Sequence, residues 1–365
     1  MSYGRCNVFV LLPWYFWIAS MSRFLQQAWM GRSGWSPYLM TLLSLIVGAF
    51  VVGSIGVVAL VWLLSGSLPV EPGAATPEAF GLTDLQFFGV NMLPFVILLG
   101  VLAVCLPVFH RRPLRSIITP TEQIDWKRLG VGTAAWMGLM VATLGIEALV
   151  TTEELAITFE WKPFLYLLLL AGTLIPIQAS VEELVMRGYL MQGAARALGS
   201  GWAAVLVSSA LFGMLHWANP EVASFGAGLM MAYYMGFGAF MALVALADDR
   251  LELAMGIHIG NNLFGTVVVT FPESVLTTPA LIRLESMAPT PGTLFTWGAV
   301  ALVFAVLMGQ RYNWTWHGLL ERLGPVDRPD DAPSEGPSTP SERIEAFRAR
   351  RMDTSADDTP DTPRE

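Results

Sequence analysis

Charged side chains are scarce in this 365-residue chain. Lysine, arginine, aspartate and glutamate together make up 14% of it, whereas 54% of the residues are hydrophobic and the mean hydropathy is +0.54. A soluble globular domain does not have this composition. The two cysteines, Cys6 and Cys105, are too few for a disulfide framework or a thiolate metal site. The sequence therefore predicts a polytopic membrane protein.

Three further features are missing from the sequence: an internal repeat, a glycine-rich phosphate-binding loop and a face of clustered positive charge. Secondary transporters commonly contain inverted repeats with paired broken helices, and nucleic-acid-binding proteins carry a basic face. The net charge of -8 says little about a substrate, because much of the acidic charge lies in the C-terminal tail. We therefore expect neither a transporter nor a nucleic-acid partner.

Long apolar runs, by contrast, are abundant. A helix needs about 20 apolar residues to cross a hydrocarbon core about 30 Å thick. The sequence predicts an all-α polytopic membrane protein with about eight transmembrane helices. The fourth run is short, and we expect it to break at Pro176 and to resume as the helix that carries Glu182. The runs are 39–64, 87–109, 129–150, 163–177, 202–217, 222–247, 253–271 and 293–309.

The basic residues favour an orientation with both termini in the cytoplasm, because cytoplasmic loops carry an excess of lysine and arginine. With eight spans and a cytoplasmic N-terminus, only Lys162 and Arg283 fall outside. We therefore expect a multi-pass protein of the cell membrane. The residues assigned to the cytoplasmic side are Arg5, Arg23, Arg32, Arg111, Arg112, Arg115, Lys127, Arg128, Arg187, Arg196, Arg250 and Arg311.

The first 38 residues differ from the apolar middle of the chain, 39–309, which we expect to be the transmembrane domain. Their apolar stretch, 7–19, is too short to span comfortably and is interrupted by Pro13. We expect a cytoplasmic or interfacial segment. A cleaved signal peptide and a true start at Met21 are the alternatives.

The C-terminal residues also separate into two parts. Residues 310–324 contain Trp314 and Trp316 and predict an interfacial helix on the cytoplasmic side. Proline and acidic residues dominate 325–365, and almost no apolar residues are available there to build a core. This composition predicts a disordered, acidic, proline-rich tail.

Five ionisable side chains interrupt the apolar sequence within three short motifs. The motifs are EELVMRG at 182–188, FGMLH at 212–216 and HIGNN at 258–262. Ionisable groups at membrane depth are costly and rare, so their presence indicates a functional site.

In the first motif, Glu183 and Arg187 stand at i and i+4, with the acid first, which is the favourable order for a helical ion pair. An alternative is a capping box formed by Ser180 and Glu183 at the start of a resumed helix. Glu182 is rotated by about 100° from its neighbour and lacks that partner. A carboxylate in such a place suits a general base.

The other two motifs place two side chains each on one helical face. Phe212 would shelter and orient His216, and His258 and Asn262 would lie one turn apart. Both members of the latter pair can donate hydrogen bonds to an oxyanion. With Glu182 and His216 holding and deprotonating a water, the combination predicts hydrolysis of an amide bond.

The three motifs together resemble the signature of the CAAX prenyl endopeptidase and bacteriocin-processing family: Glu-Glu-x-x-x-Arg, Phe-x-x-x-His and His-x-x-x-Asn or Asp. The similar region is about 163–270. The resemblance implies an all-helical intramembrane protease whose cavity opens toward the cytoplasmic side. It also implies roles by position. Glu182 and His216 would activate water, His258 and Asn262 would stabilise the oxyanion, and Glu183 and Arg187 would support the site. Phe212 completes the motif.

Two questions stay open at this level. Glu182, His216 and His258 could bind zinc, but no His-Glu-x-x-His motif is present and Asn262 is a poor ligand. We therefore favour a site without a metal cofactor. The expected substrate is a membrane-associated peptide or protein. The alternative is a non-catalytic membrane protein of the immunity or scaffold type, in which the polar cluster serves helix packing or partner binding.

Overall fold

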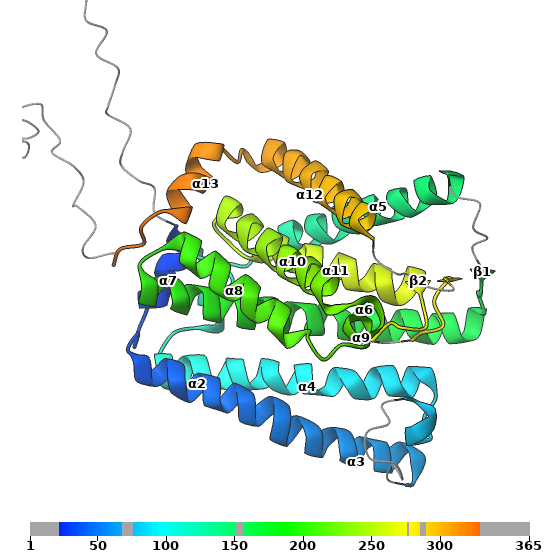
Figure 1. Ribbon diagram of the computed structural model, residues 1–365. Helices are drawn as coiled ribbons and strands as arrows, with labels where there is room; N and C mark the ends of the chain where they lie inside the picture. The colour runs from blue at the N-terminus through cyan, green and yellow to red at the C-terminus, as the bar shows by residue number, and fades with distance from the viewer. Residues whose placement is uncertain (1–21, 68–75, 151–155, 276, 285–289, 329–365) are drawn as a thin grey trace, which may run out of the picture. The chain divides into compact units, whose positions relative to one another are not determined.

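The computed structural model describes residues 22–67, 76–150, 156–275, 277–284 and 290–328, and Figure 1 shows their helices. The described residues up to Val326 form one compact unit, and a second unit begins at Asp327. Residues 329–365 of the predicted tail and the apolar stretch 7–19 lie outside the described residues.

Six helical segments of the described residues are long and apolar enough to cross a membrane. Two shorter helical segments, of which α8 is apolar throughout, occupy the remaining predicted spans. These findings confirm an all-α polytopic membrane protein. The six segments are α2–η3–α3 (Trp35–Val47, Gly48–Gly53, Ser54–Ser65), α4–η5 (Asp84–Cys105, Leu106–His110), α5 (Trp126–Val150), α6–η7–α7 (Trp161–Glu183, Leu184–Met191, Gln192–Leu198), α10 (Ala227–Asp248) and α12 (Pro291–Tyr312). The shorter ones are α8 (Gly201–Leu215) and α11–η8 (Glu252–Leu263, Phe264–Val268).

Short elements connect these helices. Three two-residue strands form a small sheet in the order β1-β3-β2, with β1 and β3 antiparallel and β2 and β3 parallel. The strands are β1 (Ala156–Ile157), β2 (Val269–Thr270) and β3 (Ile282–Arg283). The remaining helical pieces are α1 (Arg23–Gln26), η2 (Gln27–Trp29), η4 (Glu78–Phe80), η6 (Leu114–Ile117), α9 (Pro220–Phe225) and α13 (Trp316–Leu323).

The long helices expose apolar side chains on their outer faces. Leu63 on α3 is 72% exposed, Leu149 on α5 is 89% exposed and Leu302 on α12 is 65% exposed. A helix that is apolar all round belongs in a core or a membrane, and soluble monomers rarely expose apolar surface on this scale. The outer faces therefore suit contact with lipid.

The predicted break at Pro176 is wrong. α6 runs without interruption from Trp161 through Pro176 to Glu183 and continues into η7. Ser180 and Glu183 therefore lie inside a helix, and the alternative capping box does not form. Proline removes one backbone hydrogen bond, but transmembrane helices tolerate this loss where neighbouring groups compensate for it. The result is one long segment of 38 residues that carries the whole first motif.

Small residues bring α5 and α11 into backbone contact. A Cβ atom on Gly256 would lie 2.3 Å from Leu129 O of α5, and one on Gly260 would lie 2.7 Å from Thr133 O. This is the small-x-x-x-small packing of membrane helices. His258 and Asn262 each follow one of these glycines by two residues, which rotates them by about 200°. The glycine face of α11 packs on α5, and its polar face turns toward α6.

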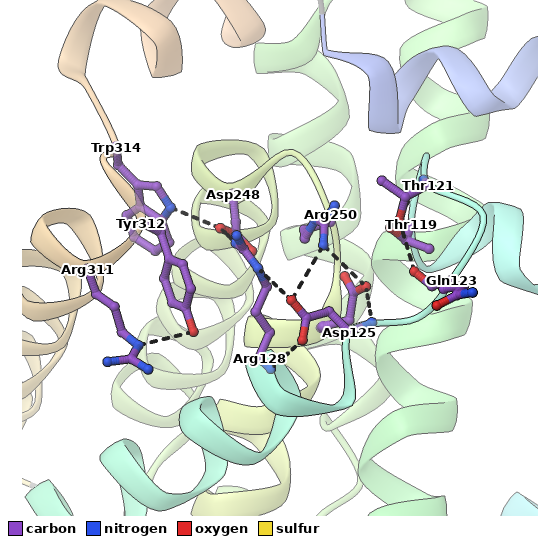
Figure 2. Close-up of polar contacts among 11 residues, drawn as sticks. Thr119, Thr121, Gln123, Asp125, Arg128, Asp248, Arg250, Arg311, Tyr312 and Trp314 are labelled. Atoms are coloured by element: carbon purple, nitrogen blue, oxygen red, sulfur yellow. Dashed lines mark hydrogen bonds and ion pairs between the residues drawn. The ribbon is translucent and has the colours of Figure 1, made fainter.

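A polar cluster fastens the turn between α10 and α11 to the neighbouring helices, as Figure 2 shows. Arg128 at the start of α5 pairs with Asp125 and with Asp248 at the end of α10. Asp248 also accepts a hydrogen bond of 3.0 Å from Trp314 Nε1, and Arg250 lies 3.9 Å from Asp125. These contacts fix the end of α11 from which the helix runs toward His258.

Candidate functional site

Glu182 lies between the two histidines of the motifs. Its Oε2 atom is 3.6 Å from His258 Nε2 and 4.0 Å from His216 Nε2. The three residues come from α6, the C-terminal end of α8 and α11. The side chains of Glu182 and His216 are 19% and 21% exposed, whereas that of His258 is 4% exposed. Glu182 and His216 therefore form the accessible side of the cluster.

Asn262 reaches the same cluster through Gln178. Asn262 Nδ2 donates a hydrogen bond of 2.9 Å to Gln178 Oε1, and Gln178 Nε2 donates to the Oε1 atom of Glu182. A second carboxamide, Asn261, donates from Nδ2 to Asn262 Oδ1 at 3.2 Å. An Nδ2 group has two hydrogens, so Asn262 retains one donor beyond its bond to Gln178.

Glu183 and Arg187 form the buried side of the cluster. Their side chains are both 0% exposed, and Arg187 Nη1 lies 2.8 Å from Glu183 Oε1. The ion pair inferred from the i and i+4 spacing is confirmed. Glu183 Oε1 also lies 2.8 Å from His258 Nδ1, and Arg187 Nη2 donates to Gly238 O of α10 at 3.0 Å. One pair thus links α6 and η7 to α10 and α11.

Aromatic rings fix the position of His216. Its ring centroid is 4.4 Å from that of Phe212 and 4.4 Å from that of Tyr234, which it stacks on at 28°. Asn219 Nδ2 donates a hydrogen bond of 3.1 Å to Tyr234 Oη. Phe212 also lies below the guanidinium of Arg187, 4.4 Å from its ring centroid. Phe212 and His216 therefore lie on one face, as the second motif predicts, and Tyr234 of α10 packs on the other side of the His216 ring.

The hydrogen-bond partners assign the ring protons of both histidines. His216 Nδ1 lies 2.7 Å from Phe212 O, which can only accept, so Nδ1 donates. His258 Nδ1 donates in the same way to the Glu183 carboxylate. In a neutral ring the Nε2 atom then carries the lone pair. Both Nε2 atoms face Glu182 Oε2.

The donor set considered for zinc, Glu182, His216 and His258, is brought together by the helices. Within the part of the chain that the structure describes, however, no group of three or more His, Cys, Asp or Glu residues is arranged to hold a metal ion. The two other histidines lie apart from the cluster. His110 contacts Tyr189 Oη at 2.9 Å, and His317 pairs with Glu321.

Sequence reasoning missed Gln178 and Tyr234. Gln178 stands one turn before Glu182 in an apolar run, and this i and i+4 spacing of two polar residues is a readable signal. Tyr234 gives no such signal. It belongs to a predicted span that contains one other tyrosine, Tyr233, and several glycines. The packing of α10 against α8 is what brings its ring to His216.

Comparisons with known proteins match the part of the chain that contains this cluster. Residues 161–264 match the family model described as Type II CAAX prenyl endopeptidase Rce1-like. YyaK of Bacillus subtilis, an uncharacterized protein, is 34% identical over 197 residues, which are 53% of this chain and 65% of YyaK. No solved structure matches. The resemblance to the CAAX prenyl endopeptidase family is thereby confirmed, and the matched segment contains Glu182, His216, His258 and Asn262.

Proposed function

We propose that the Rce1-like segment, residues 161–264, is an intramembrane endopeptidase that hydrolyses a peptide bond of a membrane-associated peptide or protein. The observation that carries the proposal is the position of Glu182 Oε2, within 4.0 Å of Nε2 of both His216 and His258. A carboxylate and two imidazoles that face one another in an apolar helical bundle are costly to maintain without a use.

Glu182 and His216 would hold the attacking water. A separation of 4.0 Å allows one water to make hydrogen bonds of ordinary length to Glu182 Oε2 and His216 Nε2. Both atoms are acceptors when His216 is neutral, which suits a water that must lose a proton. The partial exposure of the two side chains leaves this position open to water and substrate.

His258 and Asn262 would stabilise the oxyanion. Asn262 contributes the N–H that is not used by Gln178. His258 contributes Nε2–H in its imidazolium form, since Nδ1–H is committed to Glu183.

The reaction then proceeds in two steps. The water oxygen attacks the scissile carbonyl carbon as its proton passes to Glu182, and the carbonyl oxygen becomes the oxyanion. When the tetrahedral intermediate collapses, the C–N bond breaks and Glu182 returns the proton to the leaving amine. No other reactant is required.

The position of the site along the helices supports an intramembrane reaction. α8 starts beside the last turn of α7 and ends at His216, so its 15 residues place His216 about 22 Å along the helix. Five arginines lie at this starting end of the bundle, which we name the basic end: Arg32, Arg112, Arg196, Arg250 and Arg311. The distribution supports a cytoplasmic basic end, with both termini in the cytoplasm.

The test uses the purified full chain in proteoliposomes and an internally quenched peptide that ends in a farnesylated cysteine and three further residues. The same peptide without the farnesyl group tests lipid dependence. Glu182→Gln and His216→Gln should lower cleavage by about 10²- to 10⁴-fold. Glu78→Gln and His317→Gln, which change the same residue types away from the cluster, should cleave as the wild type does.

Two outcomes would redirect the proposal. Equal cleavage by wild type and Glu182→Gln would exclude the mechanism, and no cleavage of either peptide by any form would favour the non-catalytic alternative. Cleavage measured in the presence of a chelator tests whether the reaction requires a metal ion. Inhibition by chelator that zinc reverses would assign Glu182, His216 and His258 to a metal.

A further inference from the structure

A second buried arginine lies at the basic end, outside the proposed protease site. Arg112 follows η5 and is 1% exposed. Its Nη1 atom donates to Gln27 O at 2.9 Å and to Gln192 Oε1 at 3.1 Å. Both acceptors are neutral. Among the described residues, no carboxylate lies within 4.0 Å of this guanidinium.

The two remaining nitrogens of Arg112 point to an anion. Nε and Nη2 are buried and make no hydrogen bond to the described residues. These two atoms form one edge of the guanidinium, and this edge is the planar fork that binds phosphate or carboxylate in a bidentate manner. A buried charge without a counter-charge is strongly unfavourable. Burial lowers the pKa of Arg112, and the nearby Tyr38 opposes this effect.

Two further groups lie near this guanidinium. The hydroxyl of Tyr38 lies within hydrogen-bonding reach of Arg112, and the charge of Arg196 acts on the same hydroxyl. Arg196 Nε is buried and has no hydrogen-bond partner within the described part of the chain. The ring of Tyr38 packs against Gly193, where a Cβ atom would lie 2.7 Å from Tyr38 Cε1, and Arg196 follows Gly193 by one turn of α7. The residues Tyr38 and Arg196 are half-buried, so the group is reached from the edge of the bundle.

We propose that Arg112, Arg196 and Tyr38 bind a phosphate group at the basic end, supplied by an anionic lipid headgroup or by a soluble phosphate. The four donors and two positive charges suit a group with several oxygens better than the two oxygens of a carboxylate. Basic pockets between transmembrane helices on the cytoplasmic side bind lipid headgroups in this way.

The experiment uses the full chain, purified in detergent and freed of lipid. The probes are dioleoylphosphatidylglycerol, dioleoylphosphatidylcholine and inorganic phosphate. Native mass spectrometry counts bound lipid, and thermal unfolding reports stabilisation. Arg196→Gln and Tyr38→Phe change groups at the rim, and Arg112→Lys keeps the charge but removes the fork. Arg311→Gln, an exposed arginine at the same end, is the matched control.

We expect wild type and Arg311→Gln to bind one molecule of the added phosphatidylglycerol, and Arg196→Gln and Arg112→Lys to bind it at least about tenfold more weakly. Saturable stabilisation by inorganic phosphate with the same dependence on the variants, without lipid retention, would support the soluble source. Binding that is equal in all variants, binding that Arg311→Gln also loses, or no binding of any probe by the wild type would overturn the proposal.

Discussion

Among the described residues, two arginines, Arg187 and Arg112, are almost completely buried, and their surroundings differ in one respect. Arg187 has a carboxylate partner, Glu183, 2.8 Å away, and a backbone acceptor in α10. Among the described residues, the acceptors that Arg112 donates to are neutral, Gln27 O and Gln192 Oε1. Each guanidinium also lies near an aromatic ring, at 4.4 Å for Arg187 and 5.9 Å for Arg112.

The difference is one of charge neutralisation. Glu183 neutralises Arg187 within the bundle, whereas no carboxylate of the described residues neutralises Arg112. The Arg187 region contains both acidic and basic groups, so its ions can balance one another within the bundle. Within the described residues, the Arg112 guanidinium has the hydroxyls of Tyr38 and Tyr189 nearby but no carboxylate within 4.0 Å, so we expect its balancing group to come from a bound anion. We expect the first region to respond to mutation in folding and catalysis, and the second to respond to an added anion.

The largest effect should follow from Arg187→Met. The substitution leaves Glu183 buried with the His258 ring as its remaining side-chain partner, and orphaning a buried charge costs about 3 to 5 kcal/mol. Thermal unfolding of the purified protein in detergent should show this loss as a large fall in the midpoint temperature.

A double variant, Glu183→Gln with Arg187→Met, serves as the control for that loss. Removing both charges avoids the orphaned carboxylate, so much of the stability should return. If the double variant were as unstable as Arg187→Met alone, the ion pair would not be the source of the effect, and the packing of Arg187 on Phe212 would be the better explanation.

Arg112→Met should cost less. It removes donors from two neutral acceptors, Gln27 O and Gln192 Oε1, at about 1 to 3 kcal/mol. It leaves no carboxylate of the described residues behind. When the unfolding measurement is repeated with phosphatidylglycerol, the difference in midpoint temperature between Arg112→Met and wild type should increase, because only the wild type gains stability from the lipid. A gap that stays constant with lipid would contradict the distinction between the two arginines.

Much of this architecture could be predicted from the sequence. Local spacing was sufficient for the Glu183–Arg187 pair and for the contact of Phe212 with His216, because both depend only on the pitch of one helix. Apolar run length was sufficient to predict a polytopic helical fold. The catalytic roles of Glu182, His216, His258 and Asn262 stay predictions.

Contacts between helices could not be predicted. The bond between Glu183 and His258 joins residues 75 positions apart, and the bond between Gln178 and Asn262 joins residues 84 positions apart. Both depend on the packing of α11 against α6, while the glycine face of α11 packs on α5, and no local pattern reveals which helices become neighbours. At Pro176 the local signal gave a wrong prediction. Proline favours a helix break, but α6 continues through Pro176 as one long helix.

Gln178→Leu tests the region around Glu183 and Arg187, where positive and negative charges balance. Gln178 is neutral and connects Glu182 to Asn262, so its loss should affect the geometry of the reaction more than the charge balance. We expect kcat to fall about tenfold, the effect of one lost oriented hydrogen bond. Asn91→Leu is the matched control, since Asn91 is a carboxamide in a span that donates only to Phe87 O of its own helix. An equal loss in both variants would indicate a general effect on the helices.

The smallest effect should come from Tyr234, which positions His216 without carrying charge. Tyr234→Leu removes the stacked ring, and a ring contact contributes about 0.5 to 1.5 kcal/mol, so kcat should fall about two- to tenfold. Tyr234→Phe keeps the ring and loses only the hydroxyl that accepts from Asn219, so it should stay close to wild type. Cleavage kinetics at several substrate concentrations separate kcat from KM, and a change in KM alone would place Tyr234 in substrate binding. If Phe and Leu were equally impaired, the hydroxyl and not the stack would position His216.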